Sequence, residues 1–130
     1  MSRLTTGSAL AIAVITAAMT THCSSSTAPN VIALAVSVVS GAAANPGPTS
    51  YQPSPATVSL SGQEQGRVRW TNNDNATHTV TEDGGSPAFD EDNLTPGDTF
   101  TFDFTPLGPG TYTYHCDLHP AMVASVVVTP

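Results

Sequence analysis

The sequence predicts an all-β fold, a β-sandwich of seven or so short strands in about 100 residues. Three observations predict it. From Val31 onward, short runs of alternating apolar and polar residues are separated by regular turn signals. No stretch has a helical period long enough to indicate a helix. The chain is also rich in Ser, Thr, Gly, Pro and Val and poor in charge, which is typical of an extracytoplasmic β-protein.

The first half of this domain is predicted to form strands over residues 31–39, 56–60 and 67–71. Prolines and glycines between the first two strands mark loops, because proline lacks the backbone donor of a strand ladder and fixes its own backbone angle. In the third strand Val68 and Trp70 share one face, and the arginines share the other. We therefore expect the valine and the tryptophan to face the core.

The second half is predicted to add strands that include residues 78–80, 100–104, 111–116 and 124–129. In the second of these, phenylalanines alternate with polar residues, which indicates a half-buried strand with an aromatic inner face. Residues 82–93 are acidic and contain glycine. We interpret them as an exposed loop or a short irregular segment.

The N-terminal residues 1–22 are typical of an export signal, with Arg3 followed by an apolar run that is shorter than the roughly 20 residues needed to cross a bilayer. Residues 23–30 are then a flexible linker, and residues 31–130 are the folded domain. Export implies a periplasmic or extracellular protein.

Cys23 allows two endings for this leader. In one, Cys23 is the lipidated first residue of a lipoprotein, and the serine-rich residues that follow tether the domain to a membrane. In the other, an ordinary peptidase cuts nearby and Cys23 is lost or left free. A disulfide between Cys23 and Cys116 is the usual pairing for a secreted chain, but the surroundings of each cysteine favour separate roles.

The charge of the chain excludes nucleic acid as a partner. It has ten acidic residues against three arginines and no lysine, and a phosphate backbone needs a basic surface. The acids at residues 82–83 and 90–92 could steer a basic partner protein, or they could be a solvated loop without a role in binding.

Near the C-terminus, Cys116, His119 and Met122 are spaced Cys-x2-His-x2-Met, and His78 follows a polar turn upstream. A thiolate, two imidazoles and a thioether suit copper, because soft sulfur donors favour Cu(I) and a His2Cys plane with a weak Met is an electron-transfer copper site. Zinc is the main rival metal, but it seldom binds thioethers. A Cys-His nucleophile would need an oxyanion hole and an orienting residue, and neither is evident.

Strand parity separates the candidate histidines. The two tyrosines before Cys116 share its face of the strand, so if they face the core, the thiolate points inward and His115 points away. His22 lies in the leader. His78 and His119 remain, which is the number that such a site needs.

At these residues the chain resembles the cupredoxins, specifically the plastocyanin and amicyanin group of small blue copper proteins. The resemblance covers roughly residues 31–130 and is carried by these segments: Gly110 to Cys116 with His119, Pro120 and Met122; 53–58; Val68-x-Trp70-x-Asn72; 78–80; and Leu94-x-Pro96-Gly97.

The resemblance implies a Greek-key β-sandwich or barrel of about seven to eight strands that binds one type 1 copper ion. His78, Cys116 and His119 would form the equatorial plane, with Met122 as the long axial contact. The Thr79 amide would donate to the cysteine sulfur. His119 would reach the surface within an apolar patch formed by Leu118, Pro120 and Ala121.

The function that this implies is a one-electron carrier outside the cytoplasm, cycling between Cu(I) and Cu(II), and not an enzyme. Its partners would be redox proteins such as a cytochrome or a dehydrogenase, and the protein would be a monomer. A copper-delivery or buffering protein would use the same ligands. An interaction module with the same fold but no metal is a third reading.

Overall fold

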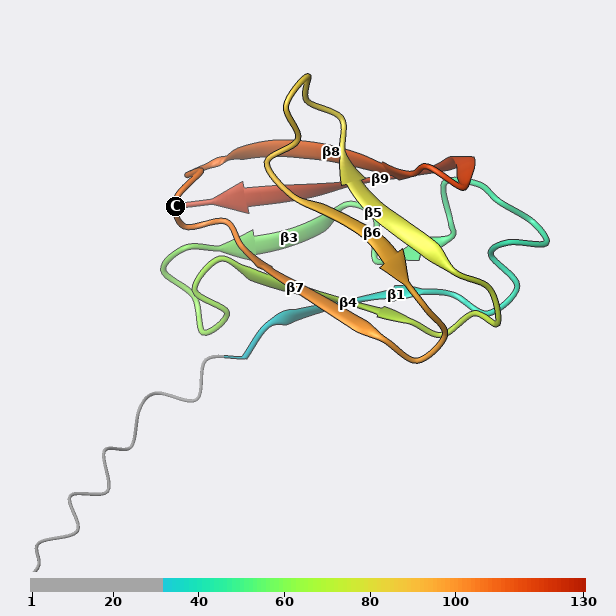
Figure 1. Cartoon of the computed structure of the whole chain (residues 1–130). Coiled ribbons are helices and arrows are strands. Elements are labelled where there is room, and N and C mark those ends of the chain that lie inside the picture. Colours follow the sequence, from blue (N-terminus) through green and yellow to red (C-terminus); the bar gives the residue numbers. More distant parts are fainter. Residues whose placement is uncertain (1–31) are drawn as a thin grey trace, which may run out of the picture.

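A computed structural model describes residues 32–130, which form nine β-strands in two facing sheets (Figure 1). The strands are β1 (Leu34–Val38), β2 (Tyr51–Gln52), β3 (Ala56–Ser59), β4 (Arg67–Asn72), β5 (His78–Glu82), β6 (Asp90–Leu94), β7 (Thr99–Asp103), β8 (Gly110–Cys116) and β9 (His119–Thr129). None of these residues forms a helix long and apolar enough to cross a membrane.

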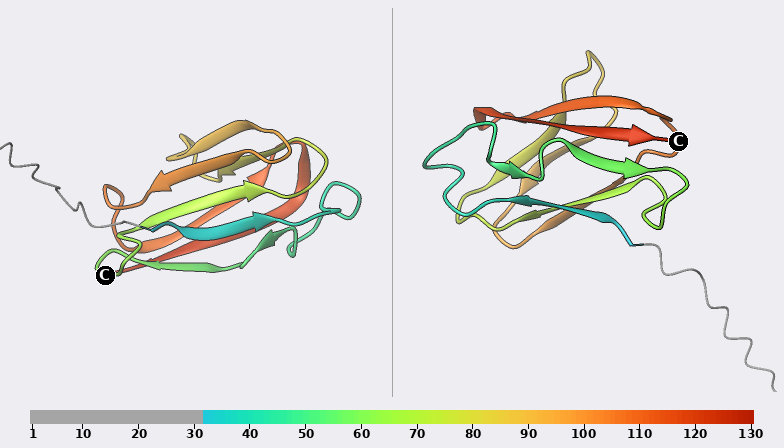
Figure 2. Two further views of the ribbon diagram at one scale, coloured as in Figure 1. Left: turned by 90° about the horizontal axis from the view of Figure 1, so that it is seen from below. Right: turned by 180° about the vertical axis from the view of Figure 1, so that it is seen from behind.

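One sheet has four strands in the order β2-β1-β4-β7, and the other has five in the order β3-β9-β8-β5-β6. The pairs β1/β4 and β3/β9 are parallel, and the other paired strands are antiparallel. The two layers are seen edge-on in Figure 2. The predicted all-β sandwich is confirmed, with two more short strands, β2 and β6, than the alternation pattern indicated.

Aromatic side chains fill the space between the sheets. Trp70 is fully buried and stacks on Phe89 and Phe100 at centroid distances of 5.7 and 5.5 Å. Tyr114 meets the same indole edge-on at 5.6 Å. Val68 is also fully buried, as the alternation in β4 predicted. Burying each such side chain stabilises the fold by about 1.5–3 kcal/mol.

The prediction for residues 82–93 was wrong in part. Asp90–Leu94 forms strand β6, which pairs antiparallel with β5. Two apolar residues that bracket this acidic stretch, Phe89 and Leu94, are buried at 3% and 1% exposure. These anchors hold the segment on the sheet edge while most of its acidic side chains face solvent.

Several strand boundaries also differ from the prediction. The first strand spans Leu34–Val38 rather than residues 31–39, and the strand expected over residues 56–60 is β3, which ends at Ser59. The last strand begins at His119, five residues earlier than expected, because it pairs with β8 directly from Cys116↔His119 onward. The segment from Cys116 to Met122 is therefore a tight hairpin rather than a separate loop.

This hairpin lies at one end of the sandwich, and the C-terminus lies at the other (Figure 1). The loop between β1 and β2 projects from the same end as the hairpin in all the views of Figures 1 and 2. Strand β5 begins there too, with His78. Three separate parts of the chain thus converge at this end.

Candidate metal centre

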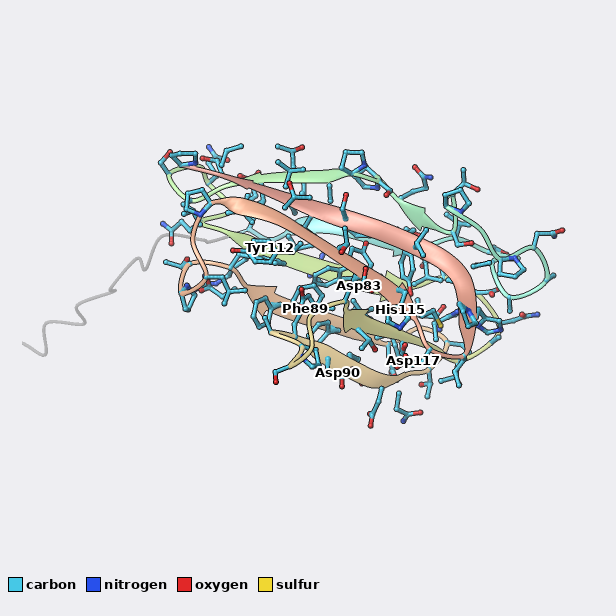
Figure 3. The ribbon with its side chains drawn as sticks, turned by 90° about the horizontal axis from the view of Figure 1, so that it is seen from above. Asp83, Phe89, Asp90, Tyr112, His115 and Asp117 are labelled. Carbon is cyan, nitrogen blue, oxygen red and sulfur yellow. The ribbon has the colours of Figure 1, made fainter. Side chains whose placement is uncertain are left out.

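The burial pattern of β8 fixes the direction of the thiol. Tyr114 and Cys116 are both fully buried, and Cys116 is a free cysteine. His115 lies between them on the opposite face, where its ring nitrogens contact the carboxylates of Asp83 and Asp117 (Figure 3). The parity prediction is confirmed: the thiol points inward, and His115 points away from it.

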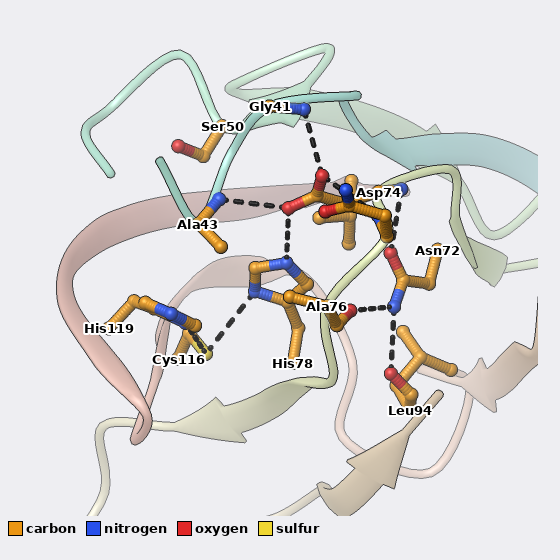
Figure 4. Close-up of polar contacts among 12 residues, drawn as sticks. Gly41, Ala43, Ser50, Asn72, Asp74, Ala76, His78, Leu94, Cys116 and His119 are labelled. Carbon is orange, nitrogen blue, oxygen red and sulfur yellow. Dashed lines mark hydrogen bonds and ion pairs between the residues drawn. The ribbon is translucent and has the colours of Figure 1, made fainter. Parts of the chain in front are cut away.

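Cys116, His78 and His119 come together at the hairpin end, with one potential ligand atom of each lying within 4.8 Å of the others. The Cys116 Sγ is 3.7 Å from Nδ1 of His78 and 3.6 Å from Nδ1 of His119 (Figure 4). With metal bonds of about 2.0 Å to nitrogen and about 2.3 Å to sulfur, these atoms would be about 3.5 Å apart in a tetrahedral site and about 3.7 Å in a trigonal one. The measured separations therefore match those of atoms that share one ion.

Asp74 contacts the ring nitrogen of His78 that faces away from the thiol. Its Oδ2 lies 2.9 Å from Nε2 of His78, and both side chains are buried. An ionised carboxylate can only accept, so Nε2 carries the proton and donates it. The lone pair on Nδ1 is then left free toward Cys116, as a metal ligand requires.

The Asp74 carboxylate has three further donors. Its Oδ1 accepts from the amides of Gly41 and Asn75, and its Oδ2 accepts from the amide of Ala43. Burial acts to raise the pKa of this carboxyl, but these hydrogen bonds together with that of His78 outweigh it and hold the pKa well below its usual range. Sequence reasoning missed Asp74; an acid four residues before a candidate ligand histidine was the available signal.

Thr79 connects the thiol to the rest of the core. Its amide donates to Cys116 Sγ at 3.3 Å, as the resemblance implied, and its hydroxyl accepts from the amide of Asp117 at 2.8 Å. The hydroxyl of Tyr51 donates to the Thr79 carbonyl at 2.6 Å, and burial, followed by the nearby Cys116, raises the pKa of Tyr51. Thr79 is therefore held through its amide, its hydroxyl and its carbonyl.

His119 and Met122 both lie on β9. His119 is partly exposed, whereas Met122 is fully buried three residues further on. Three exposed apolar residues neighbour His119 in the sequence: Leu118, at 56% exposure, Pro120 and Ala121. His119 thus links the buried thiol to an apolar surface.

The donors fit copper better than zinc. The thiol and one imidazole are fully buried, the other imidazole is partly exposed, and a buried thioether lies on the same strand. A His2Cys set with an added Met is the type 1 copper arrangement, whereas structural zinc sites use four Cys or His ligands. The site fits a single type 1 copper ion.

Comparison with known proteins agrees with this geometry. The family model for the Cupredoxin-like domain matches residues 9–128. A purple cupredoxin from Nitrosopumilus maritimus is similar in structure, with a TM-score of 0.61 and 25% identity, over 73% of this chain and 98% of that one.

Amicyanin is similar in fold. A reduced tryptophan-to-tyrosine mutant has a TM-score of 0.58 and 24% identity over 75% of this chain and 82% of its own. A methionine-to-alanine mutant with Cu(I) has a TM-score of 0.58 and 23% identity over the same shares, 75% and 82%.

Proposed function

The chain belongs to the cupredoxin-like domain family, and from that premise we propose that it is a one-electron carrier that works outside the cytoplasm. The proposed ligands of its single type 1 copper ion are His78, Cys116 and His119 in the plane and Met122 on the axis. Small proteins of this family carry electrons and are not enzymes, in line with the sequence prediction.

The observation that carries the proposal is the spacing of the donors. Nδ1 of each histidine lies 3.6–3.7 Å from the Cys116 sulfur, and each of the three residues is held by the hairpin or by the start of β5. When bound, copper supplies the Cu(I)/Cu(II) couple. A pocket whose ligands are already in place needs little rearrangement when the charge of the ion changes by one.

Different residues of the chain have different roles in such a site. His78 is held from behind by Asp74, and Cys116 is held by the Thr79 amide, so these two keep their positions. Burial of Cys116 and Met122 excludes water from the sulfur side. His119 is partly exposed and gives electrons a short route to a partner docked on the surrounding apolar residues.

The rates of electron self-exchange and of copper transfer to a chelator distinguish an electron carrier from a copper-delivery protein. We expect fast self-exchange, measured by NMR line broadening in mixtures of the oxidised and reduced protein, together with slow loss of copper to a chelator. Slow self-exchange with copper loss within seconds would instead establish copper delivery. A protein that stays colourless after Cu(II) is added would contradict both and favour the interaction module.

The location and the partners belong to the same proposal. The predicted export signal, the linker and Cys23 lie outside the described residues. We propose a periplasmic or extracellular monomer, tethered through lipidated Cys23, whose partner is a redox protein such as a cytochrome or a dehydrogenase. Detergent phase partitioning tests the tether: the wild type should enter the detergent phase, and Cys23→Ser should stay in the aqueous phase. A wild type that stays in the aqueous phase would overturn it.

A further inference from the structure

The Asp74 carboxylate is buried against four donors, all of them uncharged when the imidazole is neutral. Three are backbone amides, at 2.8 Å (Gly41), 2.8 Å (Ala43) and 2.9 Å (Asn75), and the fourth is Nε2 of His78 at 2.9 Å (Figure 4). Asp74 itself is only 5% exposed. A full negative charge is therefore held behind one proposed ligand, with little water to screen it.

We propose that Asp74 is a positioning residue that locks the His78 imidazole in the ligating tautomer and, through it, lowers the reduction potential of the site. This inference rests on the proposed function. It adds a residue that shifts the equilibrium between Cu(I) and Cu(II).

Two physical effects act in the same direction. An imidazole that donates Nε2–H to a carboxylate is a stronger base at Nδ1 than one that donates to a neutral carbonyl. A buried negative charge also attracts a doubly charged ion more than a singly charged one, and the interior screens that difference weakly. Both effects stabilise Cu(II) relative to Cu(I).

Asp74 also binds the loop between β1 and β2, through Gly41 and Ala43. A substitution at Asp74 therefore loosens this loop as well as the imidazole. Asn72 offers a matched control, because it holds the same turn through Ala76 O and Leu94 O, both at 2.8 Å, and accepts from the Asp74 amide. Among the hydrogen bonds of its side chain, none goes to His78.

The test compares the reduction potentials of the copper-loaded wild type, Asp74→Asn and Asn72→Ala by voltammetry. Each carboxylate oxygen of Asp74 accepts from two N–H donors. In Asp74→Asn, the side-chain NH2 of the new asparagine would face two of these donors in either orientation, and it cannot accept from them. Loss of such a partner weakens metal binding by about 10-fold or more. A 10-fold loss for Cu(II) alone raises a one-electron potential by about 59 mV.

We expect the reduction potential to rise by about 59 mV in Asp74→Asn and to change much less in Asn72→Ala. An unchanged potential in Asp74→Asn, or an equal rise in both variants, would overturn the inference. A wild type that shows no reversible one-electron couple would instead contradict the proposed function.

A second measurement needs neither copper nor a variant that folds. Nitrogen-15 NMR of the metal-free wild type should show His78 protonated at Nε2, with a slowly exchanging proton shifted downfield by the carboxylate. A His78 ring protonated at Nδ1, or a rapidly exchanging Nε2–H, would show that Asp74 does not hold the tautomer.

Discussion

Met122 is the proposed ligand whose effect can be changed with the least disturbance of the fold. It is fully buried on β9, and leucine has nearly the same volume, so Met122→Leu should cost less than about 1.5 kcal/mol of stability. We expect the variant to retain copper and to have a higher reduction potential, because the axial thioether is lost. An unchanged potential, measured by voltammetry, would show that Met122 is not the axial ligand.

His115 tests the assignment of the other histidines. Its ring contacts Asp83 and Asp117 on the outer face, and the hydrogen bond to Asp83 is the main cause that raises the pKa of His115. We expect His115→Ala to leave the visible spectrum of the copper protein nearly unchanged. His119→Ala is the matched comparison, since it should remove most of that spectrum. Loss of the spectrum in His115→Ala would contradict the parity argument.

Sequence reasoning could predict that Cys116, His78 and His119 lie close together, because their residue types and spacing suit one kind of metal. It missed Asp74, for which the only signal was an acid four residues before His78, because its partners Gly41 and Ala43 are more than thirty residues away and contribute only backbone amides. A backbone donor leaves no trace in residue type. Tyr51 was missed for the same reason, because it acts on the carbonyl of Thr79.

At the scale of elements, β6 shows where pattern reading fails. Asp90–Leu94 is rich in acids, which predicts a loop, but pairing with β5 and burial of Phe89 and Leu94 determine its conformation. Sheet propensity depends on context, and an edge strand tolerates acids on its solvent face. By contrast, the alternation in β4 and β8 was enough to predict which residues are buried.

Phe89 anchors the segment between β5 and β6 to the core. It is 3% exposed, stacks on Trp70 and meets Phe104 at a centroid distance of 5.4 Å. We expect Phe89→Ala to lower the free energy of unfolding by about 3–5 kcal/mol, measured by chemical denaturation of the metal-free protein. Leu107→Ala, at a position 39% exposed, should change it by at most about 0.5 kcal/mol. Equal effects would show that Phe89 does not anchor the segment.

The pairing of β4 with β7 makes a pH-dependent contribution to the stability of the fold. Asp103 lies 3.3 Å from Arg67, its cross-strand partner, and hydrogen bonds from Thr105, followed by the charge of Arg67, lower the pKa of Asp103. Because this pKa is lower in the folded state, the stabilisation is fully present above the unfolded value of 3.8 and is lost as the pH falls through the folded value.

We therefore expect Asp103→Asn to lower the free energy of unfolding at pH 7 by up to about 1 kcal/mol, since the pair is partly exposed. The difference from the wild type should shrink below pH 4 in denaturation experiments over a pH series. Asp92→Asn, at an exposed position, is the control for the change in net charge. A difference in the free energy of unfolding that stayed constant down to pH 2 would show that ionised Asp103 does not stabilise the fold.

For the described residues as a whole, the position of the site relative to the two ends of the sandwich agrees with the proposed role. β1 begins, and β9 ends, at the opposite end of the sandwich from the ligand hairpin (Figure 1). A tether that enters at β1 would leave the His119 surface pointing away from the membrane. The net charge of −7 would favour encounters with a basic partner.

The central claim is that four side chains from two parts of this fold bind one copper ion with a thiolate in its plane. Visible absorption and electron paramagnetic resonance of the Cu(II)-loaded chain test it most directly. We expect one copper per chain, intense thiolate-to-copper absorption and a small parallel hyperfine splitting, with the absorption lost in Cys116→Ser. A pale protein with a large splitting, unchanged in Cys116→Ser, would contradict the claim.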